Sequence, residues 1–253
     1  MTSPSAPDAV RQNLWEFIRR YHRHEVDYDA ALPQEPVLFV GNHGFGGVFD
    51  LNVISLSRAI HNEVSRPITY LVHQIAWTMR MGWFVEPFGC KSASVENARE
   101  AFEAGHHVVV FPGGDIEAGK AFQHRNQVMF GGRSGFARLA MEHGVPIVPV
   151  VTAGAGESLF VLNSGEDLAR ALRLPESLRL KALPVSLSLP WGLNVGLVGM
   201  LPYLPLPSKL RTAVMAPMTP EADEDAAHFA ARVHAAMQER LDALVAGRTW
   251  LIG

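Results

Sequence analysis

The sequence contains a single cysteine, Cys90, among its 253 residues. One thiol excludes an intramolecular disulfide and a zinc site built from several cysteines. Low-pKa thiolates are the exception in proteins, so we expect Cys90 to be a small packed residue and not a nucleophile. The first thirty residues lack the apolar core of a secretory signal peptide, and we therefore expect a cytoplasmic protein.

An excess of charge of either sign is also absent. Lys and Arg number 22 and Asp and Glu number 25, for a formal net charge of −3. Nucleic-acid-binding proteins usually carry a basic patch or stripe, so we expect no nucleic-acid partner. No pair of histidines has convincing metal-ligand spacing, and we expect neither a metal site nor a bound cofactor.

Charged residues are missing altogether from residues 182–208. The stretch is long enough to cross a bilayer as a helix, but its five prolines and three glycines make that helix implausible. Trp191 and Tyr203 lie within it and basic residues flank both ends, which suits a water–lipid interface. The same apolar content also fits a pair of buried strands with Pro-rich turns, and both interpretations stay open.

Apolar runs alternate with helical patterns along most of the chain. An amphipathic helix is predicted at residues 9–23, and a final helix is predicted to start at Thr219 and Pro220 and to end at Gly247. Between them, strands are predicted at 37–40, 68–72, 107–111 and 145–151, and helices after the loop 41–47 to about Ile60, then at 75–81, 94–105 and 134–143. This order predicts a single α/β domain over residues 1–253, with a mostly parallel central sheet and helices on both faces.

The glycine-rich loop after the first of these strands contains His43 and Asp50. A carboxylate that accepts a proton from one imidazole nitrogen leaves the other nitrogen free as a base. Glycines in this loop would let a substrate approach the backbone closely. Taken alone, a histidine and an aspartate in such a loop are a weak indication of function.

A second glycine-rich loop follows the strand that ends at Phe111. The amides of Gly113 and Gly114 could stabilise an oxyanion or hold a phosphate. The nearby cations are candidates for binding phosphate or a pantetheine-bearing donor. These candidates are Lys120, Arg125 and Arg133. The alternative is that the glycines are ordinary turn residues and the charges are solvated.

Together these blocks resemble the lysophospholipid or glycerolipid acyltransferase superfamily, above all a bacterial branch similar to mono- and diacylglycerol acyltransferases. The resemblance covers roughly residues 36–151. It is carried by Asn42-His43 to Asp50, by the run from Phe111 to Gly114, and by Val145-Pro146-Ile147-Val148-Pro149-Val150. It implies acyl transfer from acyl-CoA or acyl carrier protein to a lipid hydroxyl, with His43 as base and no acyl-enzyme. The acceptor then implies peripheral association with the inner face of the membrane.

The chain departs from the family pattern at three places. Six residues instead of four separate His43 from Asp50, and Gly113 stands where the family has Glu, with Glu117 as the acidic counterpart. The Arg that grips acceptor phosphate has no clean match, and Lys91 is the nearest substitute. These departures favour a neutral acceptor alcohol. Two other functions stay open, a thioesterase that uses water in the same site and a noncatalytic lipid-binding protein of the same fold.

Overall fold

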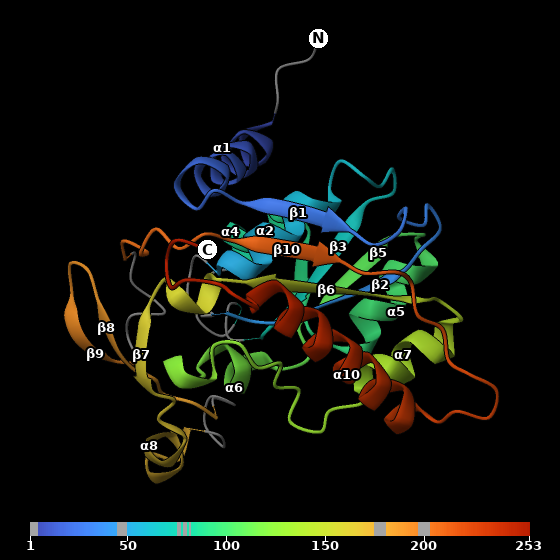
Figure 1. Ribbon diagram of the computed structural model, residues 1–253. Coiled ribbons are helices and arrows are strands. Elements are labelled where there is room, and N and C mark those ends of the chain that lie inside the picture. Colours follow the sequence, from blue (N-terminus) through green and yellow to red (C-terminus); the bar gives the residue numbers. More distant parts are fainter. Residues whose placement is uncertain are drawn as a thin grey trace.

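A computed structural model describes residues 5–44, 50–74, 82–174, 181–196 and 203–253, together with Trp77 and Arg80. In these ranges the chain forms a seven-stranded sheet in the order β1-β10-β6-β2-β5-β3-β4 and a three-stranded sheet in the order β7-β8-β9 (Figure 1). The strands of the large sheet are β1 (Glu25–Tyr28), β2 (Leu38–Gly41), β3 (Ile68–Val72), β4 (Cys90–Ser92), β5 (His107–Val110), β6 (Ile147–Ala153) and β10 (Arg211–Val214).

Five adjacent strands of the large sheet, from β6 to β4, run parallel. Only β10 and β1, at one edge, run the other way. Strand β2 lies between β5 and β6. The chain passes from β2 to β3 and β4 on one side of β2, and later crosses from β5 to β6 on the other side. In open α/β sheets the crevice at the carboxyl ends of the strands beside such a change of side is the usual place for a binding site.

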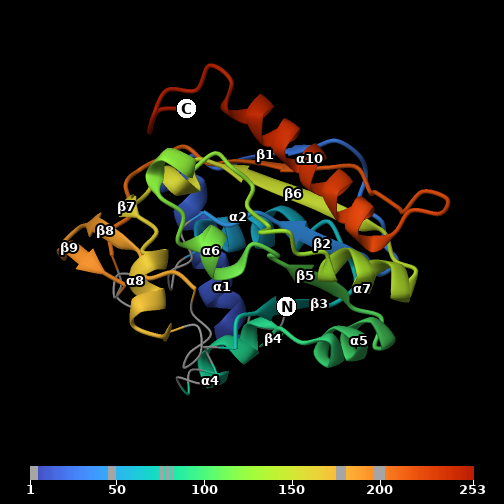
Figure 2. The ribbon, with the colours of Figure 1, turned by 90° about the horizontal axis from the view of Figure 1, so that it is seen from below.

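Helices cover both faces of the large sheet, as Figures 1 and 2 show. Leu38 and Val40 of β2 point to the face covered by α5 (Val95–Glu103), α7 (Gly135–His143) and α10 (Ala226–Val245). Phe39 points to the opposite face, where α2 (Leu51–Ile60) packs and α1 (Ala6–Tyr21) lies outside it. This alternation buries β2 on both sides, which explains its uninterrupted apolar sequence. The predicted α/β architecture is therefore confirmed.

The remaining elements are short and lie mainly at the ends of the strands. They are α4 (Gly82–Val85), η1 (Glu86–Phe88), α6 (Gly114–Ala118), η2 (Phe122–His124), η3 (Ala155–Glu157) and α8 (Glu166–Ala171), with the small-sheet strands β7 (Phe160–Asn163), β8 (Val185–Ser188) and β9 (Gly192–Val195). No helix in the described ranges is both long enough and apolar enough to cross a membrane.

The two terminal helices differ from their predicted bounds. Helix α1 runs from Ala6 to Tyr21, instead of 9–23, because the Ser5 side chain caps it by accepting the Asp8 amide. Helix α10 begins at Ala226, so a start at Thr219 and Pro220 was wrong. The Asp225 side chain caps it, accepting the amides of Ala227 and His228 at 2.9 Å. The predicted helix 75–81 lies largely outside the described residues.

Within residues 182–208, the described ranges contain the strands β8 and β9, and one side of this pair is exposed. Strands β8 and β9 make a hairpin in which Leu187 is 52 % exposed and Leu193 is 66 % exposed. Of the two interpretations left open, the pair of strands is confirmed for these residues, but the pair is buried on one side only. Residues 197–202 of this stretch lie outside the described ranges.

Candidate active site

The side chains of His43 and Asp50 meet at the carboxyl end of β2. Nδ1 of His43 lies 2.6 Å from Oδ2 of Asp50, and the two side chains are 15 % and 9 % exposed. A carboxylate only accepts hydrogen bonds, so Nδ1 carries the proton and Nε2 keeps its lone pair. Residues 45–49, with the remaining glycines of the loop, lie outside the described ranges. The geometry is that of a histidine base oriented by an aspartate.

Helix α2 holds the carboxylate of Asp50 in place. Asp50 is the N-cap residue, and its Oδ1 accepts the amides of Asn52 at 2.9 Å and Val53 at 3.3 Å. The two carboxylate oxygens therefore have separate roles, one to cap the helix and one to orient His43. Capping by a charged acceptor at a helix N-terminus is favourable, which lets the fold stabilise a buried carboxylate.

Two asparagines fix the backbone on either side of His43. The Asn42 side chain bonds both backbone groups of Thr152 on β6, accepting its amide at 2.8 Å and donating to its carbonyl at 3.3 Å. The Asn52 side chain donates to the Asn42 carbonyl at 2.6 Å. Sequence reasoning did not single out Asn52 or Thr152. A polar residue on the apolar face of the predicted helix, between Leu51 and Leu56, was the available signal for Asn52.

The surroundings of His43 raise its pKa above the ordinary value. Burial alone would lower that pKa, but the charge of Asp50, the hydrogen bond to Asp50 and the charge of Glu117 more than offset the effect of burial. The ring also lies 4.7 Å from the ring of Phe111, centroid to centroid. A raised pKa makes His43 a stronger base, and it also means that more of the protein holds His43 protonated near neutral pH.

The loop 112–114 lies next to this pair, and its backbone is largely engaged. The Gly114 amide donates to the Phe111 carbonyl at 3.1 Å. One guanidinium nitrogen of Arg133 donates to the carbonyls of Pro112 and Gly113, each at 2.6 Å. The Gly114 amide is thus used in a turn, which speaks against its predicted role as an oxyanion donor. Arg133 holds the loop in shape through these bonds.

Glu117 and Lys120 form a buried charge pair behind the loop. Their side chains are 0 % and 2 % exposed, and Nζ of Lys120 lies 3.7 Å from Oε1 of Glu117. Lys120 also donates to the Gln127 carbonyl at 2.6 Å, and Glu117 accepts the Met129 amide at 3.0 Å. Burial lowers the pKa of Lys120. The Lys120 amine is buried and already hydrogen-bonded, whereas a lysine that binds phosphate would be exposed to the ligand.

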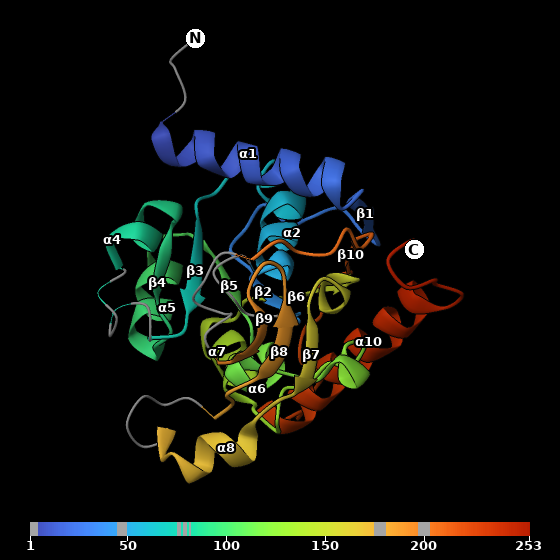
Figure 3. The ribbon, with the colours of Figure 1, turned by 90° about the vertical axis from the view of Figure 1, so that its left-hand side faces the viewer.

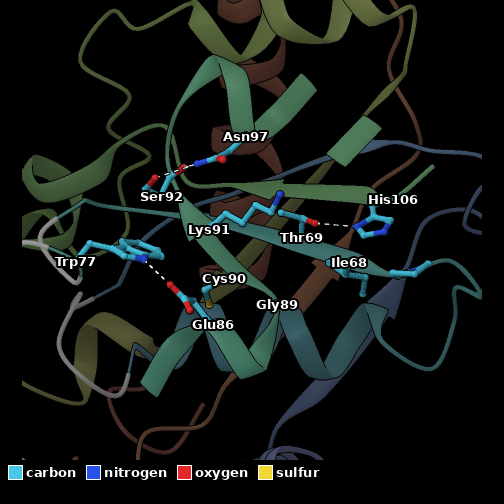
Figure 4. Close-up of a pocket in the computed structure, with 11 residues that line it drawn as sticks. Ile68, Thr69, Trp77, Glu86, Gly89, Cys90, Lys91, Ser92, Asn97 and His106 are labelled. Atoms are coloured by element: carbon cyan, nitrogen blue, oxygen red, sulfur yellow. Dashed lines mark hydrogen bonds between the residues drawn. The ribbon is translucent and has the colours of Figure 1, made fainter. Parts of the chain in front are cut away.

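The other two predicted cations lie in different surroundings. Arg125 stacks on the ring of Phe122 at 4.2 Å and donates to its carbonyl at 3.0 Å. Lys91 lies on β4, where it pairs with Glu100 at 2.9 Å and lines a surface pocket with Thr69, Ser92 and Asn97 (Figure 4). Neither His43 nor Asp50 lines this pocket. Strands β5 and β3 lie between β4 and β2 in the sheet, so the structure does not bring Lys91 to the His43 site.

A family model that matches nearly the whole chain identifies the family of this protein. The model of the diacylglycerol acyltransferase family matches residues 5–248. The chain belongs to the diacylglycerol acyltransferase family. His43, Asp50 and the loop at Gly113 all fall within the matched range, so the site described above is part of the family domain.

Relatives of the chain come from a bacterium and from a vertebrate. An uncharacterized protein of Mycobacterium leprae is 31 % identical over 251 residues, covering 94 % of this chain and 65 % of the relative. A Gallus gallus protein named "DGAT1/2-independent enzyme synthesizing storage lipids" is 27 % identical over 228 residues, covering 89 % of this chain and 61 % of the relative. The chain thus spans just under two thirds of the length of these relatives.

Among solved structures, the chain is similar to the 1-acyl-sn-glycerophosphate acyltransferase PlsC from Thermotoga maritima. The TM-score is 0.55 with 15 % sequence identity, over 94 % of this chain and 82 % of that one. At this identity the likeness shows the fold alone. The seven-stranded sheet and its helices therefore share the fold of that acyltransferase.

Proposed function

We propose that this protein transfers an acyl group from an acyl thioester to the hydroxyl of a neutral glycerolipid. The observation that carries the proposal is the 2.6 Å contact between His43 and Asp50 at the carboxyl end of β2. Membership of the diacylglycerol acyltransferase family supports the reaction class. The name of the Gallus gallus relative, which refers to storage lipids, supports a neutral acceptor.

The reaction proceeds by direct transfer in this proposal. Nε2 of His43 takes the proton of the acceptor hydroxyl as its oxygen attacks the thioester carbonyl, and Asp50 stabilises the imidazolium that forms. The tetrahedral intermediate then collapses, the carbon–sulfur bond breaks, and the thiolate leaves with the proton that His43 holds. The donor is acyl-CoA or acyl carrier protein, and the chain supplies no covalent nucleophile.

The surroundings of the four candidate cations favour a neutral acceptor over a phosphorylated one. A phosphate is best gripped by an arginine that pairs with two of its oxygens at once. Lys91 is engaged with Glu100 away from His43, Lys120 is buried, and Arg133 is bonded to the carbonyls of the loop. We assign the remaining candidate, Arg125, to binding a phosphate of the acyl donor.

Competition between monoacylglycerol and lysophosphatidic acid at equal concentration, with labelled acyl-CoA and separation of the products, tests the proposal. We expect the neutral product to dominate in the wild type and to vanish in His43→Ala. A preference for lysophosphatidic acid of more than about tenfold, or some 1.4 kcal/mol in transition-state binding, would overturn the neutral acceptor. Thioester hydrolysis that proceeds unchanged whether or not acceptor is added would instead identify a thioesterase.

A further inference from the structure

The hairpin β8–β9 turns its apolar side chains outward. Val185 pairs with Val195 and Leu187 with Leu193 across the two strands. Of these, Leu187, Leu193 and Val195 are 52 %, 66 % and 45 % exposed. Leu189 and Trp191, at the turn between the strands, are 56 % and 46 % exposed. Apolar residues therefore cover one side of the hairpin from its base to its tip, and the solvent meets them directly.

The side of the hairpin that faces the protein is polar. Ser186 and Ser188 are 0 % and 5 % exposed, and the Ser186 hydroxyl has no hydrogen-bond partner among the described residues. Asn194, which pairs with Ser186, donates to the Ser188 hydroxyl at 3.4 Å. In a strand with one solvated side, apolar residues normally face the protein and polar ones face water. A shift of one residue would restore that order, yet the hairpin holds the inverted register.

The small sheet lies beyond the same end of the large sheet as His43 (Figure 1). In Figure 1 the small sheet stands beyond the end of the large sheet at which β6 finishes, and in Figure 3 β8 and β9 lie in front of β2. The link runs through η3, since a Cβ atom on Gly44 would lie 2.7 Å from Cβ of Ala155. From η3 the chain continues through Leu159 into β7, and Leu159 and Val161 pack with Tyr203. One short segment therefore connects the site of His43 to the exposed apolar side.

We infer that the outward side of β8–β9 inserts into the surface of the bilayer that holds the acceptor lipid. This inference rests on the proposed function for the identity of the acceptor. An apolar medium removes the cost of exposing the Leu and Val side chains and accounts for the inverted register. Trp191 at the turn is of the type enriched where water meets lipid. Residues 182–208 contain no charge, and the exposed Lys181 just before them suits anionic headgroups.

Flotation with vesicles of phosphatidylcholine and phosphatidylglycerol tests the inference on the full chain. We expect the wild type to float and the double variant Leu187→Glu, Leu193→Glu to lose at least tenfold in vesicle-bound fraction. Val95→Glu is the matched control, because Val95 is 62 % exposed on α5, and it should bind as the wild type does. A wild type that stays in the aqueous fraction, or an equal loss in the control, would overturn the inference.

Turnover separates this inference from the proposed function. With a short-chain acceptor dissolved as monomers, the double variant should retain wild-type turnover, which also shows that it is folded. With the same acceptor class embedded in vesicles, its turnover should fall at least tenfold. A wild type that floats without transferring acyl groups would contradict the proposed function and leave the bilayer contact supported. A wild-type dimer that the double substitution dissociates, with vesicle binding unchanged, would assign the hairpin to a second copy and overturn the inference.

Discussion

Nδ1 of His43 lies 2.6 Å from Oδ2 of Asp50, although six residues separate the histidine from the aspartate here and four separate them in the family pattern. The contact survives the longer loop because both ends are held independently. Asn42 ties the start of the loop to Thr152 of β6, and Asp50 itself caps α2 at the far end. The two anchored points keep the side chains of His43 and Asp50 in contact.

We expect His43→Ala to reduce acyl transfer by about 10²–10⁴-fold, the range typical of a lost general base. Asp50→Asn should be nearly as severe, because the amide no longer stabilises the imidazolium that forms on His43. Initial rates with acyl-CoA and a lipid acceptor measure the loss. His228→Ala is the control, since that side chain is 80 % exposed on α10. Near wild-type turnover of His43→Ala would remove His43 from the mechanism.

The rate should rise with pH through the pKa of His43, because only the neutral imidazole accepts a proton. Asp50 and Glu117 outweigh burial and hold this pKa above its ordinary value near 6.5. The midpoint of the acidic limb should therefore lie above that value. Glu117→Gln removes one of the charges that raise the pKa, so its midpoint should move to lower pH.

Glu142→Gln is the control for this shift, because Glu142 is exposed on α7 and its charge is screened by solvent. The profile of kcat/KM against pH reports the pKa of the free enzyme and is the measurement to compare. If the midpoint stayed in place in Glu117→Gln, the carboxylate of Glu117 would have no electrostatic role at His43.

Cys90→Ser should change turnover by less than about threefold, because direct transfer needs no thiol nucleophile. Burial raises the pKa of the Cys90 thiol to about 11, so the reactive thiolate is scarce at neutral pH. Two measurements check this prediction. One is the turnover of the variant, and the other is the intact mass of the wild-type protein after the reaction has been quenched part-way. An acyl group found on Cys90, together with loss of activity in the variant, would replace direct transfer with a two-step mechanism.

Arg248→Ala should destabilise the fold by about 3–5 kcal/mol, because it leaves a buried charge without its partner. Arg248 and Glu157 are each 3 % exposed, and Nε lies 2.8 Å from Oε1. The comparison is Arg240→Ala, whose pair with Asp29 is 27 % and 33 % exposed and should contribute about 0–1 kcal/mol. Chemical denaturation of both variants decides the matter, and equal losses would argue against the role of burial.

Patterns within a few residues predict much of this molecule. The strand at Ile68–Val72 and the helix capped by Ser94 follow from apolar runs and a capping residue close in sequence. The pairing of His43 with Asp50 follows from the motif, because its spacing is itself local. Lys120 could not be placed this way. A lysine in a loop suggests a solvated charge, and its burial depends on how the chain from Glu117 to Gln127 packs.

The hairpin shows a second limit of sequence patterns. The alternation Val185-Ser186-Leu187-Ser188 identifies a strand with one apolar side, since successive side chains point to opposite faces. It does not say which side meets the protein, because that depends on what lies above and below the strand. Only the packed structure shows that the serines face inward.

Glu117 also limits which residues position 113 of the neighbouring loop can hold. A Cβ atom at position 113 would lie 2.1 Å from Oε2 of Glu117 and 2.3 Å from its Cβ, so the space for any side chain there is already taken. An acid can reach this loop from position 113, as in the resembling family, or from position 117. It cannot do so from both with the backbone placed as it is here. Because the Cβ atom of residue 117 alone would lie 2.3 Å away, removing the Glu117 carboxylate would not make room for Gly113→Glu, and the backbone of the loop would also have to shift.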